Sequence, residues 1–116
     1  MIATIKNELG TISISEKVIT TLVVESASEA YGLVGLAAQN VKDGIFELLR
    51  VDNYSRGVSV RVNGDRVEID LTVIMEYGVR IAIVADNIIE KVKYNIESNT
   101  GLVVESVNVI VQGIRV

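Results

Sequence analysis

The chain has 116 residues, of which 15 are acidic and 11 basic, and its formal net charge is -4. It contains no His and no Cys, which excludes disulfides, thiol nucleophiles, thiolate or histidine metal sites and every catalytic triad built on an imidazole base. The net negative charge argues against sequence-independent nucleic-acid binding, which needs massed lysine and arginine.

Hydrophobic residues make up 49% of the chain, and the excess of Val and Ile among them favours strands. The length predicts one domain spanning residues 1–116, large enough to bury a core. The sequence shows no leader peptide and no apolar run of the ~18 residues that a membrane-spanning helix needs. A mean hydropathy of +0.41 is high for a lone soluble domain, which indicates that a partner or a second copy covers some apolar surface.

Two short strands and a helix are predicted near the N-terminus. Residues 2–7 and 11–14 have the β-branched or alternating patterns of strands. Ser15 is a candidate N-cap for a helix over residues 16–30, whose hydrophobic positions recur at spacings of three and four and form one face. A short apolar strand at 33–38 follows.

The strongest local signal is a β-hairpin between two Val-rich strands. Hydrophobic residues alternate with polar ones at positions 58–62 and again at 67–75. Between them Asn63-Gly64 predicts a two-residue type I′ turn, which requires two positive φ angles.

The segments on either side of this hairpin complete the predicted order. Before it we expect a short helix over residues 40–50 and a loop over 51–57. After it, periodic hydrophobic residues predict a second long helix from Arg80 to about Ser98, ended by Thr100-Gly101, and a last strand over 102–112.

The predicted element order is β-α-β-(α)-β-β-α-β. Each helix has one hydrophobic stripe and each long strand one hydrophobic face. We therefore expect an α+β fold in a single two-layer domain, with two main helices packed on one face of a four- to five-stranded mixed sheet. Ile74 and Ile110 fall on the opposite, outer face by parity, so both are candidate partner contacts.

Two sequence patterns could carry chemistry. Glu68 and Asp70 share one strand face, and paired carboxylates can act as acid and base or hold a hard cation. The strand pattern requires polar residues there anyway, which favours an ordinary solvated face. Gly32 and Gly35 have the spacing of a phosphate clamp, but no basic residue follows, so we interpret them as a helix stop and a packing glycine. We expect no catalytic residue, no cofactor and no metal site.

A cluster of arginines is the only concentrated positive charge in the sequence. Arg50, Arg56, Arg61 and Arg66 fall close together and could dock an acidic partner or a lipid headgroup. An ordinary solvated hairpin tip with charges that prevent aggregation is the alternative interpretation. Arg56, Arg61 and Arg66 are candidate partner contacts, whereas the scarce aromatic residues do not interleave with them as a single-strand stacking platform would require.

Three segments follow one another in the order of a known family. They are Gly10-Thr11-Ile12-Ser13-Ile14-Ser15 before the first helix, Val67–Leu71 leading through Glu76-Tyr77-Gly78 into the second helix, and Thr100-Gly101-Leu102 followed by Val107-Asn108-Val109. With them the chain resembles the alkaline-shock-protein family, the envelope stress response proteins of Gram-positive bacteria. It is similar to the short branch, which stops after the last strand. The loop at 51–57 does not match the family pattern.

The resemblance implies a non-enzymatic structural and interaction protein of cell-envelope homeostasis. It implies a cytoplasmic homo-oligomer that reaches the membrane through a separate anchoring protein. We expect neither direct membrane insertion nor a nucleic-acid partner. An alternative is an accessory subunit for a dihydroxyacetone-kinase-like or fatty-acid-kinase-like enzyme, because short members are often encoded beside such a protein. No catalytic residues are established for the family, so none is carried over.

Overall fold

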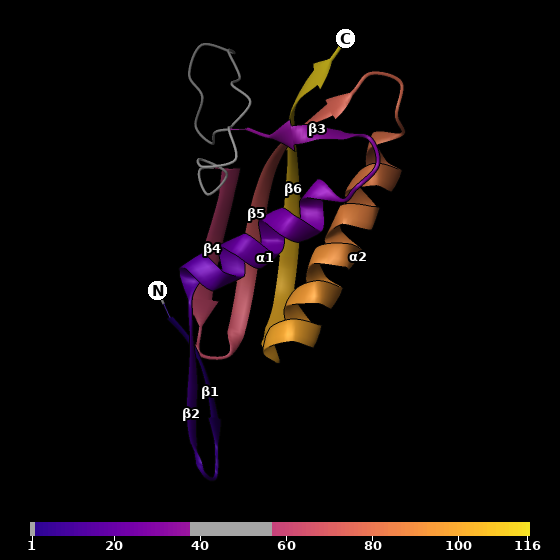
Figure 1. Ribbon diagram of the computed structural model, residues 1–116. Coiled ribbons are helices and arrows are strands. Elements are labelled where there is room, and N and C mark those ends of the chain that lie inside the picture. The colour runs from indigo at the N-terminus through magenta and orange to yellow at the C-terminus, as the bar shows by residue number, and fades with distance from the viewer. Residues whose placement is uncertain (1, 38–56) are drawn as a thin grey trace.

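The computed structural model describes residues 2–37 and 57–116 (Figure 1). The expected helix over 40–50 and the loop up to residue 56 lie outside the described residues. The elements are β1 (Ile2–Asn7), β2 (Gly10–Ser15), α1 (Glu16–Ser28), β3 (Leu33–Leu36), β4 (Val58–Asn63), β5 (Arg66–Glu76), α2 (Ile81–Thr100) and β6 (Val103–Arg115). The predicted α+β class is confirmed.

Strand β5 is the centre of the main sheet. β4 runs antiparallel to its first half and β3 antiparallel to its last residues, so these two strands lie end to end along one edge. β6 runs parallel to β5 along the other edge. Parallel neighbours need a crossover connection, and α2 supplies it. The result is the expected four-stranded mixed sheet.

The N-terminal strands form a separate hairpin, which the sequence did not predict. β1 and β2 pair antiparallel with each other in their own two-stranded sheet. In the turn, Asn7 Oδ1 accepts two backbone N–H groups at 2.8 and 3.0 Å, the type of local bond that makes asparagine a turn residue. The hairpin projects beyond the main sheet (Figure 1). Thr4 N–H donates to the Gly64 carbonyl at 3.0 Å and ties the hairpin to the β4–β5 turn.

Both helices pack on one face of the main sheet, as predicted. α1 lies over β4 and α2 beside β6, and the two helices contact each other (Figure 1). The polar contact between them is partly buried: Asn95 Nδ2 donates to Ser26 Oγ at 2.9 Å, and Ser26 Oγ donates to the Leu22 carbonyl at 2.7 Å. The fully buried large side chains are Ile19, Val23, Val67, Ile69, Leu71, Val73, Met75, Ile88, Val92, Ile96 and Leu102.

The helix ends follow local sequence signals. Ser15 Oγ accepts the Val18 N–H at 3.4 Å, which confirms the predicted N-cap of α1. Gly101 ends α2 with a φ of 79°, the left-handed conformation typical of a helix C-terminus. α2 begins at Ile81 and extends to Thr100, so its predicted bounds differ by one or two residues at each end.

The turn between β4 and β5 is shifted by one residue from the prediction. Its two residues are Gly64-Asp65 instead of Asn63-Gly64, and Gly64 has a φ of 65°. The predicted turn would have placed Arg61 opposite Arg66, whereas the observed register places Arg61 opposite Glu68. Like charges directly opposite each other destabilise a strand pair and opposite charges stabilise it. Electrostatics therefore favours the observed register.

Replacing Ile88 by alanine tests the helix–sheet interface. Ile88 is fully buried, so Ile88→Ala should lower the free energy of unfolding by about 2–5 kcal/mol through lost burial and a cavity. Ile83 on the same helix is 50% exposed, and Ile83→Ala should change this free energy by no more than about 0.5 kcal/mol. Urea denaturation measures both, and equal losses would contradict the assigned helix face.

Replacing Gly64 by valine tests the backbone of the β4–β5 turn. No atom lies within 4 Å of an added Cβ, so the cost comes only from holding a β-branched residue at positive φ, roughly 1–2 kcal/mol or more. Gly10 also has open space around it but no positive φ, so Gly10→Val is the matched control. Thermal unfolding should separate the two variants, and a silent Gly64→Val would show that the turn has another conformation.

Candidate functional site

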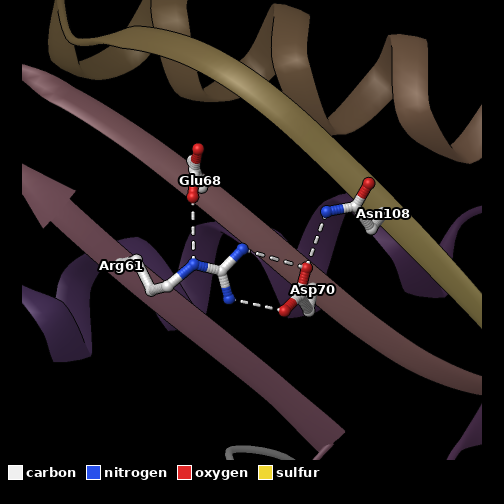
Figure 2. A network of polar contacts seen from close by, with 4 residues as sticks. All are labelled: Arg61, Glu68, Asp70 and Asn108. Carbon is white, nitrogen blue, oxygen red and sulfur yellow. Dashed lines mark hydrogen bonds and ion pairs between the residues drawn. The ribbon is translucent and has the colours of Figure 1, made fainter.

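The main sheet carries a polar cluster on the face opposite the helices (Figure 2). It consists of Arg61 on β4, Glu68 and Asp70 on β5, and Asn108 on β6, and we call it the outer-face network. The strand register brings these residues together, because Arg61 pairs with Glu68 and Asp70 pairs with Asn108. Alternate residues of a strand point to the same face, which explains why Glu68 and Asp70 share it.

A single guanidinium binds both carboxylates. Arg61 Nε donates to Glu68 Oε2 at 3.0 Å. Its Nη1 and Nη2 donate to the two oxygens of Asp70 at 2.6 and 3.4 Å, the forked arrangement that arginine forms with a carboxylate. Asn108 Nδ2 adds a fourth bond, to Asp70 Oδ1 at 2.8 Å. The network thus links all three neighbouring strands (Figure 2).

The hydrogen bonds of the network favour the charged forms of Arg61 and Asp70. The hydrogen bonds from Arg61, and after them the one from Asn108, lower the pKa of Asp70. The same bonds to Asp70 and Glu68 raise the pKa of Arg61. A general acid must hold a proton near neutral pH, and a general base works best with a pKa near the operating pH. Asp70 is therefore poorly suited to either role.

The network is equally unsuited to a cation. The Arg61 guanidinium already occupies the space between Glu68 and Asp70 (Figure 2), and a metal ion would have to displace it. Within residues 2–37 and 57–116, no group of three or more acidic side chains could hold a metal ion. The arrangement can join strands and present a polar surface whose single cation is fully engaged by two carboxylates.

The structure places two of the three predicted contact arginines in ion pairs. Arg61 is held by the network, and Arg66 Nη1 lies 3.4 Å from Glu105 Oε1 on β6. Arg56 lies outside the described residues. A cavity of about 160 Å³ at this end of the sheet is lined by Arg61, Val62, Asn63, Arg66, Glu68 and Glu105. Because each of these arginines has an acidic partner, the cavity does not concentrate positive charge.

The two predicted hydrophobic contact residues differ in accessibility. Ile110 is 49% exposed, but Ile74 is only 3% exposed, so its side chain is not available at the surface. Thr72, which precedes Ile74 on the same face of β5, is equally buried. Of the two, only Ile110 offers apolar surface.

Sequence reasoning missed the bonds that define the outer-face network. It identified Glu68 and Asp70 as a pair but assigned Arg61 to a separate basic cluster. The placement of the turn was the signal that could have revealed the bond, since a Gly64-Asp65 turn puts Arg61 opposite Glu68. Asn108 follows 38 residues after Asp70, and only the strand order brings it there. No helix in the part of the chain that the structure describes is long and apolar enough to cross a membrane.

The fold and the network together define a small α+β domain with a polar sheet face on which Arg61 binds two carboxylates. Two solved variants of MamM-CTD are similar in fold, each with a TM-score of 0.52 over 85% of this chain and 98% of the other. Sequence identity is 15% in both comparisons, so the likeness concerns the fold alone.

A model of the alkaline-shock-protein family, described by a cell envelope-related function, matches residues 4–116. The chain belongs to this family, which confirms the resemblance carried by its sequence motifs. YloU of Bacillus subtilis (strain 168) is 45% identical over 97% of this chain and 94% of its own length. Spy1614 of Streptococcus pyogenes serotype M6 is 43% identical over 100% of this chain and 97% of its own length.

The lowered pKa of Asp70 predicts how acid affects stability. A carboxyl whose pKa falls on folding stabilises the protein above its unfolded pKa of about 3.9, and this contribution is lost as the pH falls through the folded pKa. Below about pH 4, the free energy of unfolding of Asp70→Asn should therefore fall less steeply than that of the wild type. Glu8→Gln, outside the network, should follow the wild type. Urea unfolding across this pH range measures the slopes, and equal slopes for Asp70→Asn and wild type would contradict the prediction.

Proposed function

We propose that the protein is a non-enzymatic structural and interaction protein of cell-envelope homeostasis, which acts through self-association and protein partners. Membership of the alkaline-shock-protein family, described as cell envelope-related and matched over residues 4–116, supports the cellular role. The outer-face network carries the non-enzymatic part of the proposal. Its paired carboxylates, the strongest candidates for chemistry, are bound by one arginine and serve to join strands.

Exposed hydrophobic side chains support a role in binding other proteins. Single exposed hydrophobic residues are ordinary on a protein surface, but here several lie on the same elements. The projecting hairpin exposes Leu9 fully and Ile12 by half. The most exposed hydrophobic side chains of α2 and β6 are Ile81, Ile83, Tyr94, Val103 and Ile110. We take these exposed side chains as the candidate contacts with protein partners. By the same proposal the protein is cytoplasmic and reaches the membrane only through a partner.

Complementation distinguishes this role from that of an enzyme. Deleting the gene in its host should sensitise cells to envelope stress, and a Glu68→Gln, Asp70→Asn double variant should restore growth as well as the wild type does. An enzyme that used these carboxylates would lose its function in this variant. Failure to restore growth by a variant that circular dichroism shows to be folded would overturn the non-enzymatic proposal.

The molar mass in solution tests the proposed self-association. Size-exclusion chromatography with light scattering should give a mass above the 12.6 kDa of one chain that rises with concentration. A monomer at all concentrations that also recovers no partner from the host would overturn the proposal. Recovery of a kinase-like enzyme in fixed proportion to the monomer would favour the accessory-subunit alternative.

A further inference from the structure

Strand β6 forms a long edge of the main sheet. It is 13 residues long and pairs with β5 along one side. Within residues 2–37 and 57–116, no strand pairs with its other side. An edge of this kind presents backbone N–H and C=O groups that can pair with a strand of another chain.

The middle of β6 lacks the charged residues that usually protect an edge strand. Natural edge strands are often short or carry charged residues. β4, on the opposite edge, has six residues with Arg61 among them. In β6, by contrast, residues 106–114 contain no charged residue and no proline. Register shifts interrupt its pairing with β5 only between Val104 and Ser106 and between Val111 and Gly113.

Hydrophobic side chains also line both faces of this edge. Ile110 is 49% exposed on the outer face. Val109, Val111 and Ile114 are only partly buried where β6 packs against the hydrophobic core. A strand placed beside β6 would cover hydrophobic side chains on both faces of the sheet. It would also form hydrogen bonds with the free backbone N–H and C=O groups of this edge.

We propose that β6 pairs antiparallel with β6 of a second copy of this chain, with Ile110 on the two-fold axis. This inference rests on the proposed self-association and names its surface. In this register Ile110 lies opposite itself and Val109 lies opposite Val111 of the second copy. The only two charged residues of the strand, Glu105 and Arg115, then lie opposite each other at both ends.

The charge pattern selects this register and a second copy as the occupant. An antiparallel pair shifted along the strand would lose both Glu105–Arg115 pairs. Opposite charges across neighbouring strands stabilise their pairing. Glu105 Oε1 already forms an ion pair with Arg66 of its own chain. The other carboxylate oxygen of Glu105 can bind Arg115 of the second copy. The contact uses the same surface on both copies, which gives a closed dimer with one continuous sheet.

A single introduced thiol tests the axis. The chain has no cysteine, so Ile110→Cys provides the only thiol. Residues directly opposite in an antiparallel pair have Cβ atoms about 4.5–5.5 Å apart, close to disulfide geometry. Ile110→Cys should therefore form a disulfide-linked dimer under mild oxidation. Val103→Cys is the matched control on the same strand, at a residue 39% exposed. Its two thiols would lie roughly 45 Å apart and should not link.

A charge placed on the axis tests the same contact without a covalent bond. Ile110→Lys puts two ammonium groups opposite each other and should weaken dimerisation at least tenfold by light scattering. Val103→Lys should leave the molar mass unchanged. Glu105→Arg alone should weaken dimerisation, and the Glu105→Arg, Arg115→Glu double variant should restore it. Because Ile110 is half exposed, circular dichroism should show both lysine variants folded.

The outcomes separate this inference from the proposed function. If the wild type associates but Ile110→Cys does not link and Ile110→Lys still associates, the β6 contact is overturned and self-association stands. If Ile110→Lys still self-associates but no longer co-purifies with another protein of the host, β6 binds a strand of that protein and self-pairing is overturned. A wild type that stays monomeric overturns both self-association and this contact, while complementation still tests the envelope role.

Discussion

The structure depends on the pairing of β5 with strands along both of its edges. Three strands contact it, and the parallel neighbour β6 can be reached only through a crossover, which α2 provides. The inward residues at alternate positions from Val67 to Met75 are at most 1% exposed. This face of β5 therefore lies at the centre of the hydrophobic core that the helices complete. Loss of its register would turn these side chains toward solvent.

The same alternation places two carboxylates close together on the outer face. Glu68 and Asp70 both point away from the core, and two neighbouring carboxylates repel each other unless a cation lies between them. Arg61 removes this repulsion from the adjacent strand, and Asn108 donates to Asp70 from the other side. A pair of acidic residues that resembles an active site in the sequence is thus a structural bond across the sheet. Because both carboxylates already bind Arg61, this arginine is not free to attract an acidic partner.

The parts of the fold that depend on local patterns were predictable from the sequence. The helices follow from hydrophobic spacing and from Ser15 and Gly101, and the β4–β5 hairpin follows from alternating valines. The turn was misplaced by one residue because Asn63-Gly64 has the stronger local preference, while cross-strand pairing of Arg61 decides the register. The contact between Asp70 and Asn108 and the burial of Ile74 depend on strand order and tertiary packing. The spacing of the neighbouring residues predicts neither of these two features.

Strand β6 runs from the hydrophobic core at its start to a partly exposed region further along. Burial decreases along this strand, since Val104 and Val107 are at most 7% exposed whereas Val109 and Val111 are only partly buried. Asn108 fixes the strand between these two regions by its bond to Asp70, directly beside Ile110. The half-exposed Ile110 therefore lies next to a residue that is bonded across the sheet. A binding strand that is already ordered loses little conformational entropy when another strand pairs with it, so the outer-face network supports the edge that we propose pairs with a second copy.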